Sequence, residues 1–193
     1  MSRRSVITDA AITTVAAKGL HGLTHREVDR AADLPEGSTS YYFRTRASLL
    51  AAAVERLSEL DEVELPTISA ADLDALADAA ARLLHRWMTV DRDRQLARYE
   101  LTLEANRRPE LREALVHSGA RVRRAVAGLL AEAGAPAPEA TANKLTALLG
   151  GLLFDHVAGT SREVPEVAHL ADTIRSLIGA LVDDTRTSTT NSR

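Results

Sequence analysis

The sequence predicts an all-α protein of about nine helices: a small N-terminal group of three, joined by a fourth helix to a larger bundle. Apolar residues recur every three or four positions along most of the chain, as on the buried face of a helix. Helix start and stop signals punctuate this pattern, and no segment shows convincing strand alternation. With 193 residues, 45% of them hydrophobic, the chain can bury a sizeable core.

The first two predicted helices occupy residues 4–18 and 25–32. One face of the first helix carries the apolar residues Ile7, Ala11, Ile12 and Val15. Gly19 follows as a stop signal. Thr24 can cap the second helix, while Glu27, three residues later, can reach back to the N–H of the cap residue. These residues predict a reciprocal capping box at the start of the second helix.

A short turn at Asp33 and Leu34 leads to a third helix, which we expect to begin at Pro35, where a missing N–H costs nothing. Two short helices joined by such a turn form a helix-turn-helix, whose second helix enters the major groove of DNA. Small hydroxyl side chains there can reach base edges, while tyrosines, arginines and helix N-termini contact phosphates. The expected DNA-contacting residues of this segment are Thr24, Arg26, Gly37, Ser38, Thr39, Ser40, Tyr41 and Tyr42.

Tyr41, Tyr42 and Phe43 are half of the six aromatic residues in the chain. Packing in the core or between domains is one interpretation of such a cluster. It is favoured for Phe43, which offers hydrophobic area and no hydrogen-bond donor. The helix-turn-helix context and the flanking arginines favour a solvent-facing position for both tyrosines.

The net charge of −3 argues against a nucleic-acid-binding protein, but the charges are unevenly distributed. Residues 1–50 carry seven Lys or Arg against five Asp or Glu, whereas the remaining 143 residues carry 17 against 22. This asymmetry indicates a weakly basic contact module attached to a larger acidic domain.

Residues 6–55 resemble the DNA-binding domain of the TetR family of bacterial repressors. The resemblance lies in the segments DAAITTVAAKG, LTHREVDRAADL and PEGSTSYYFRTRASLLAAAVE. RYELTLEANRRPEL also resembles a C-terminal segment of an actinobacterial subgroup of this family. The chain departs from the family pattern at Asp33, Pro35 and Tyr42. The resemblance implies that Arg46, at the start of a fourth helix over residues 46–60, contacts the DNA backbone, and Thr45 can cap that helix.

The remaining chain is predicted to be helical to residue 184. A fifth helix carries the apolar stripe Leu73, Leu76, Ala80, Leu83, Leu84 and Trp87, and a sixth continues over Leu96, Tyr99 and Leu103. A seventh runs from Pro109 to about Gly134, and the last two cover residues 138–158 and 165–184. We therefore expect a DNA-binding domain over residues 1–50, a ligand-binding and dimerisation domain over 61–184, and a disordered tail over 185–193.

The resemblance implies that the last two helices pair with their copies in a second chain; ordinary core packing is the alternative. The expected dimer-interface residues are Leu145, Leu149, Leu152, Leu153, Ile174, Leu177, Ile178 and Leu181. A ligand pocket between bundle helices is expected where bulky or polar groups interrupt an Ala/Leu-rich core. The candidate ligand-binding residues are Trp87, Tyr99, Leu103, His117, Arg121 and Phe154.

Other classes of function receive no support. Cysteine is absent, the six histidines form no metal-ligand pattern, and no nucleophile elbow or phosphate-binding loop is present, so we expect no enzyme activity, metal or cofactor. The apolar run over residues 145–154 is too short to span a membrane, which favours a cytoplasmic protein, associated with the nucleoid when bound to DNA.

The leading hypothesis is a homodimeric, ligand-responsive transcriptional regulator. It would act as a repressor on a palindromic double-stranded DNA operator and respond to an unknown small-molecule inducer. The alternative is a helical ligand-binding or interaction module without DNA binding.

Overall fold

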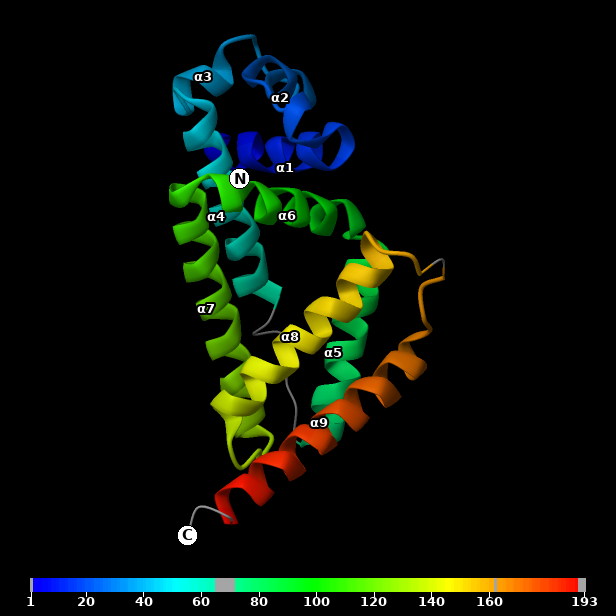
Figure 1. Cartoon of the computed structure of the whole chain (residues 1–193). Coiled ribbons are helices and arrows are strands. Elements are labelled where there is room, and N and C mark those ends of the chain that lie inside the picture. The colour runs from blue at the N-terminus through cyan, green and yellow to red at the C-terminus, as the bar shows by residue number, and fades with distance from the viewer. Residues whose placement is uncertain (1, 65–71, 162, 191–193) are drawn as a thin grey trace. The chain divides into compact units, whose positions relative to one another are not determined.

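The computed structural model describes residues 2–64, 72–161 and 163–190. Within these ranges the chain forms nine α-helices and one short 3₁₀ helix, with no strand (Figure 1). The predicted all-α fold class is therefore confirmed. No helix in the described ranges combines the length and the apolar character needed to cross a membrane.

The chain divides into two compact units. The first unit comprises Met1–Asp61 and Asp93–Gly119, and the second comprises Glu62–Arg92 and Ala120–Arg193. The helices that begin the chain are α1 (Arg3–Gly22), α2 (His25–Ala31), α3 (Ser38–Tyr42) and α4 (Arg46–Glu64). They are followed by α5 (Leu73–Met88), α6 (Arg92–Glu104), the 3₁₀ helix η2 (Ala105–Arg107), α7 (Pro109–Glu132), α8 (Pro138–Val157) and α9 (Val167–Thr190).

The core of the first unit joins α1 to α4 with α6, η2 and the start of α7. Its largest fully buried side chains are Ile7, Leu23, Phe43, Leu49, Leu50, Leu57, Leu101 and Leu111. Phe43 is only 1% exposed, and the Arg4 guanidinium lies 4.6 Å from its ring centroid. Of the three adjacent aromatic residues, Phe43 is thus the one that belongs to the core, as predicted.

The first helix begins and is interrupted at recognisable signals. The Ser2 hydroxyl accepts a hydrogen bond from the Ser5 N–H at 3.0 Å and caps α1. Gly19 breaks the helix with a φ of 64°, a left-handed value that glycine adopts without a steric penalty. The predicted stop is therefore present, although a short helical segment continues to Gly22.

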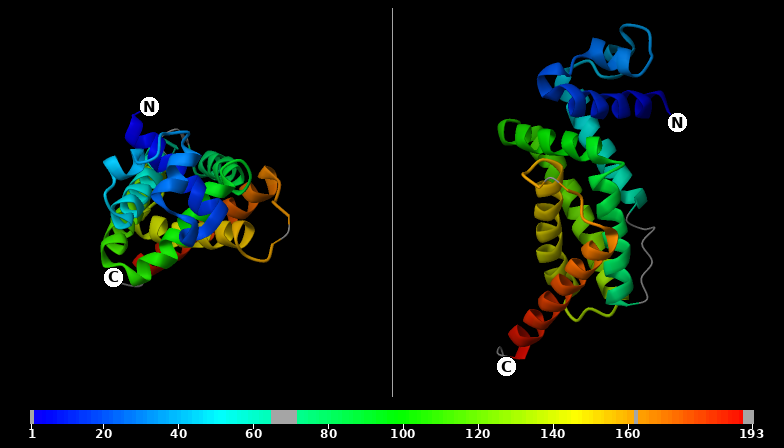
Figure 2. Two further views of the ribbon diagram at one scale, coloured as in Figure 1. Left: turned by 90° about the horizontal axis from the view of Figure 1, so that it is seen from above. Right: turned by 90° about the vertical axis from the view of Figure 1, so that its right-hand side faces the viewer.

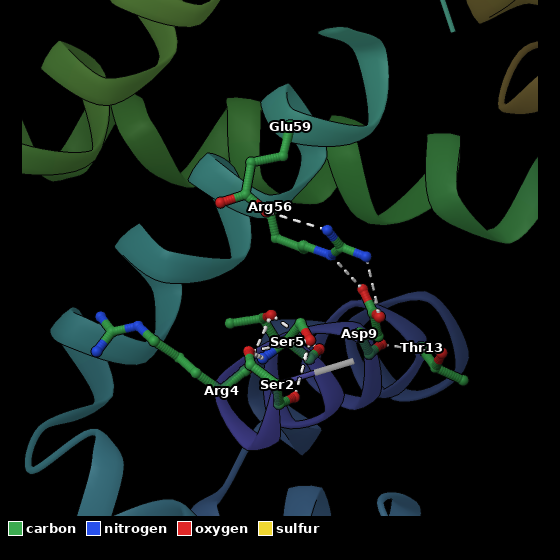
Figure 3. A network of polar contacts seen from close by, with 8 residues as sticks. Ser2, Arg4, Ser5, Asp9, Thr13, Arg56 and Glu59 are labelled. Atoms are coloured by element: carbon green, nitrogen blue, oxygen red, sulfur yellow. Dashed lines mark hydrogen bonds and ion pairs between the residues drawn. The ribbon is translucent and has the colours of Figure 1, made fainter. Parts of the chain in front are cut away.

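An ion pair fastens α4 to α1 inside the first unit (Figure 3). Arg56 Nε lies 2.7 Å from Asp9 Oδ1, and Arg56 Nη2 lies 3.3 Å from Asp9 Oδ2. The same guanidinium also reaches Glu59 at 3.0 Å. Two parallel bonds to one carboxylate fix direction as well as distance, so the pair sets the orientation of α4 on α1.

In the second unit, α5, α8 and α9 pack side by side (Figures 1 and 2). Their buried residues include Leu76, Leu84, Leu145, Leu153, Leu170, Ile174 and Ile178. Arg175 of α9 supports this packing from the surface, because it pairs with Asp74 and Asp78 of α5, each at 2.9 Å.

The predicted ends of the fourth and last helices differ from the structure. The fourth helix continues past residue 60 to Glu64, and α9 continues to Thr190. Residues 185–190, which we expected in a disordered tail, are therefore helical, and residues 191–193 lie outside the described ranges. Polar composition suggested disorder, but the backbone of α9 stays helical to Thr190.

Candidate nucleic-acid interface

The segment between α2 and α3 is a turn built on two left-handed residues, Asp33 with a φ of 52° and Gly37 with a φ of 94°. Gly37 separates Pro35 from the helix, so α3 begins at Ser38 and the predicted start at Pro35 is wrong. The Pro35 carbonyl instead accepts hydrogen bonds from the N–H and the hydroxyl of Ser38, at 3.1 and 2.7 Å.

The Asp29 carboxylate of α2 caps the start of α3. Asp29 Oδ2 accepts from the Gly37 N–H at 2.8 Å, and Oδ1 accepts from the N–H and the hydroxyl of Thr39 at 2.7 and 2.5 Å. Asp29 is 3% exposed and Thr39 is fully buried. Burial alone would raise the pKa of Asp29, but the hydrogen bonds from Thr39 and Gly37 outweigh it and lower the pKa.

We expect Asp29→Asn to destabilise the protein near neutral pH by about 1–3 kcal/mol, because a buried N–H loses its acceptor. The Asp29 pKa is lower in the folded than in the unfolded chain, so its stabilisation exists above about pH 3.9 and is lost as the pH falls further. Urea unfolding measured from pH 7 to 3 should show that the difference in free energy of unfolding between wild type and Asp29→Asn becomes smaller in acid. A difference that becomes larger in acid would contradict this assignment.

Two residues predicted to contact DNA have other partners. Thr39 is buried with its hydroxyl bonded to Asp29, so it cannot reach a base edge. Arg46 Nε donates to the Leu23 carbonyl at 3.2 Å, and its Nη2 donates to the Leu20 carbonyl. These bonds close the end of α1, and a phosphate contact from Arg46 would compete with them.

The predicted capping box at α2 forms only in part. The Thr24 hydroxyl accepts from the Glu27 N–H at 3.2 Å, as expected. The Glu27 side chain does not return to the cap but pairs with Lys18 and Arg30. Hydrogen bonds from Lys18 and then Arg30 lower the pKa of Glu27, which keeps this carboxylate charged.

The remaining predicted residues of α3 face solvent, and we call Ser38, Ser40, Tyr41 and Tyr42 the polar face of α3. Tyr41 is 81% exposed and Tyr42 is 40% exposed, with their rings edge to face at 5.2 Å between centroids. Ser40 is exposed and Ser38 is half-buried. This face offers hydroxyl donors and acceptors without burying them, which is the chemistry of groove and phosphate contact.

Over α2 and the turn that precedes α3, charges of both signs surround an open depression of about 330 Å³. It is lined by Arg26, Asp29, Arg30, Asp33, Leu34 and Glu36. Arg26 Nε lies 3.4 Å from Glu36 Oε1, and both side chains are 71% exposed. An exposed pair of this kind is weak, so Arg26 can exchange Glu36 for another anion.

The six candidate ligand-binding residues are divided between the two units. Tyr99, Leu103 and His117 belong to the first, and Trp87, Arg121 and Phe154 belong to the second. Leu103, His117 and Phe154 are exposed, whereas the other three are half-buried. Burial raises the pKa of Tyr99 to about 12, so its phenol stays neutral.

Trp87 has a charged neighbour that the sequence pattern did not indicate. Its indole N–H donates to Glu64 Oε2 at 2.8 Å, and the Glu64 side chain is 13% exposed. Arg86 Nη2 lies 3.9 Å from the other Glu64 oxygen, at the outer limit of an ion pair. The second unit therefore holds an indole ring and a largely buried carboxylate in contact.

The predicted dimer-interface residues separate into two classes. Leu145, Leu153, Ile174 and Ile178 are buried in the core of their own chain, so they cannot form the surface of contact with a second chain. Leu149, Leu152, Leu177 and Leu181 are half-buried and keep a solvent-facing part. An exposed, largely apolar strip remains on α8 and its C-cap residue, formed by Ala147, Leu148, Gly151, Phe154 and Ala158. We call it the outer strip of α8.

Asp29 and His25 of α2, which contact α3 and its C-cap residue, were not among the predicted site residues. A signal for Asp29 was present, because an acidic residue in the last turn of a helix opposes the helix dipole and needs another reason to be there. His25 carried no comparable signal. Its Nε2 lies 2.6 Å from the Phe43 carbonyl, a contact across 18 residues.

Two family models match the chain. "Bacterial regulatory proteins, tetR family" matches residues 7–53, which include α2 and α3. "Tetracyclin repressor-like, C-terminal domain" matches residues 71–184. No curated protein matches the chain.

Solved structures resemble the chain over nearly its full length. The multidrug binding protein EbrR in complex with ethidium is 35% identical, with 91% of this chain and 98% of that chain covered and a TM-score of 0.68. EbrR in complex with malachite green is 32% identical, with 92% and 98% covered and a TM-score of 0.67. A TetR-family member from Streptomyces coelicolor A3 is 33% identical, with 92% and 98% covered and a TM-score of 0.70.

Proposed function

Because the chain belongs to the TetR family of bacterial regulatory proteins, we propose that it is a homodimeric repressor that binds a palindromic DNA operator and is released by a small-molecule inducer. The proposal that the chain binds DNA is supported by the polar face of α3. Four of the five residues of this helix, all except the buried Thr39, carry hydroxyl groups on its exposed or half-buried side, and Asp29 caps the helix start.

The dimer is supported by the outer strip of α8. Leu148 and Phe154 are each 46% exposed, and they share this strip with small residues that would let a second helix approach closely. Two copies of α3 related by a twofold axis would meet successive major grooves about 34 Å apart. This geometry requires a palindromic site.

The inducer would act by binding one conformation of the dimer better than another. If the preferred conformation spaces the two α3 helices wrongly for the operator, ligand binding lowers DNA affinity without touching the DNA interface.

The direct test is selection of duplexes from a random DNA pool by the full-length protein, followed by affinity measurements over a range of salt concentrations. We expect a palindromic consensus and a linear fall of log affinity with log salt, because phosphate contacts release counterions. Absence of any enriched sequence at low salt would contradict the proposal. Retained ligand binding in that case would select the alternative, a ligand-binding module without DNA binding.

Glu36→Gln is expected to strengthen binding to all DNA sequences by about three- to tenfold and to steepen the salt dependence. The substitution removes a negative charge beside the polar face and frees Arg26 for a phosphate or base. Fluorescence anisotropy on selected and unrelated duplexes would measure both effects. Glu132→Gln, the same charge change on the exposed end of α7, serves as the control and should leave affinity unchanged. Equal effects from both variants would contradict a local role for Glu36.

For the inducer we propose the class of aromatic cations, to which the ethidium and malachite green bound by EbrR belong. The support within this chain is the contact between Trp87 and Glu64. An indole face attracts a cation, and a carboxylate with little solvent around it strengthens that attraction.

Ethidium added to the protein without DNA is expected to quench the fluorescence of Trp87, the single tryptophan of the chain. Glu64→Gln keeps an oxygen that can accept the indole hydrogen bond but removes the charge, so the affinity should fall about tenfold. Glu132→Gln is again the matched control. Unchanged ethidium affinity in Glu64→Gln would exclude Glu64 from recognition of the cation.

A further inference from the structure

The recognition helix α3 has only five residues, too few for its own backbone hydrogen bonds to hold it. Two side chains of α2, His25 and Asp29, lie four residues apart and contact its opposite ends. We propose that His25 and Asp29 are positioning residues that fix the orientation of the polar face of α3, and hence the affinity for specific DNA. This inference rests on the proposed function in so far as it concerns DNA.

At the start of α3, Asp29 replaces the acceptors that a helix terminus lacks. The first N–H groups of a helix have no partner within the helix, and Gly37, at the cap position, has no side chain to supply one. The two oxygens of Asp29 accept from the N–H groups of Gly37 and Thr39. Because both bonds run to one buried carboxylate, they define the direction of the helix axis and not only its distance from α2.

The Thr39 hydroxyl fixes the rotation of α3 about its own axis. It donates to Asp29 Oδ1 at 2.5 Å from a fully buried position. With Thr39 held inward, its neighbours Ser38 and Ser40 and the following Tyr41 must lie toward the outside of the helix. A helix rotated to another register would bury one of these hydroxyls and expose Thr39.

Just past the end of α3, His25 holds the carbonyl of the C-cap residue, Phe43. His25 Nε2 donates to the Phe43 oxygen at 2.6 Å, and the Phe43 N–H donates to the Thr39 carbonyl at 2.8 Å. The Phe43 ring is buried in the core of the first unit. The helix is thus restrained at its first turn by a carboxylate, and at its end by an imidazole and a buried ring.

Substitutions at Thr39 distinguish positioning of α3 by the Thr39 hydroxyl from simple packing of the side chain. Thr39→Val keeps the shape but loses the hydroxyl, whereas Thr39→Ser keeps the hydroxyl but loses a methyl group. Each variant would be titrated with a duplex selected by the wild type and with an unrelated duplex, at a temperature where circular dichroism shows every variant folded. His25→Leu and Asp29→Asn extend the series to the two positioning residues.

We expect Thr39→Val, Asp29→Asn and His25→Leu each to weaken binding to the selected duplex about tenfold or more, with less than twofold change on the unrelated duplex. Thr39→Ser should bind like the wild type. Amide hydrogen exchange of α3 should be faster in the three weakened variants, measured without DNA. Equal losses on both duplexes, or wild-type binding and exchange in Thr39→Val, would overturn the inference.

The two proposals fail in different ways. If the wild type selects no DNA, the proposed function fails, and the exchange rates of α3 in Thr39→Val and Asp29→Asn still decide whether these side chains hold the helix. If the wild type selects DNA and Thr39→Ser loses as much affinity as Thr39→Val, the methyl group and not the hydroxyl is responsible, and the positioning role is overturned.

Discussion

Leu148→Asp is expected to convert the proposed dimer into monomers and to lower the affinity for a palindromic duplex by about 100-fold or more. Leu148 lies on the outer strip of α8 with 46% of its surface exposed, so a charge there is harmless to the single chain. In a dimer the same charge would be buried without a partner, which costs several kcal/mol. Sedimentation equilibrium and DNA titration of the same sample would measure both consequences.

Val90→Asp is the matched control, because Val90 is an 80% exposed apolar residue just outside the C-terminal end of α5. It should leave both the oligomeric state and the DNA affinity unchanged. A Leu148→Asp protein that remains dimeric would show that the outer strip of α8 is not the dimer interface.

Phe43→Ala is expected to destabilise the protein by about 3–5 kcal/mol, whereas Tyr41→Ala should change stability by less than about 0.5 kcal/mol. Phe43 is 1% exposed at the centre of the first unit, and Tyr41 is 81% exposed two residues earlier. Urea unfolding followed by circular dichroism would give both values.

When both variants are compared under conditions where each is folded, we expect Tyr41→Ala to weaken DNA binding more than Phe43→Ala does. Tyr41→Ala removes a surface hydroxyl and ring that we assign to the DNA interface, so binding should weaken although stability is kept. Loss of stability in Tyr41→Ala, with DNA affinity retained, would reverse the assignment of the two rings.

Local signals in the sequence predicted the positions of most helices. The Thr24 cap, the Gly19 interruption and the start of α8 at Pro138 each depend on residues within one turn of the boundary, so they can be recognised without a structure. Pro35 is an exception, because it does not begin α3. A favourable first-turn proline was outweighed by the left-handed conformation of Gly37 two residues later.

Contacts between distant residues explain why Thr39 and Arg46 have other partners than the predicted DNA. Thr39 has the chemistry of a base-reading hydroxyl, and only its partner Asp29, ten residues away, shows that it faces inward. Arg46 likewise has the charge for a phosphate contact but donates to carbonyls more than 20 residues away. Residue type gave the possible chemistry, and tertiary contacts decided which groups remained available.

The proposed dimer surface could not be predicted from the sequence for a different reason. Leu145 and Leu148 are equally apolar and one helical turn apart, yet Leu145 is 3% exposed and Leu148 is 46% exposed. An apolar period identifies the faces of a helix that avoid water but does not distinguish a core within one chain from an interface between two.

Methylation interference on a selected palindromic duplex tests most directly whether two copies of α3 lie in successive major grooves. Dimethyl sulfate marks guanine N7 in the major groove and adenine N3 in the minor groove. We predict two symmetric clusters of guanine N7 interference centred about ten base pairs apart. Interference confined to adenine N3, or a single cluster without symmetry, would contradict recognition by a pair of α3 helices.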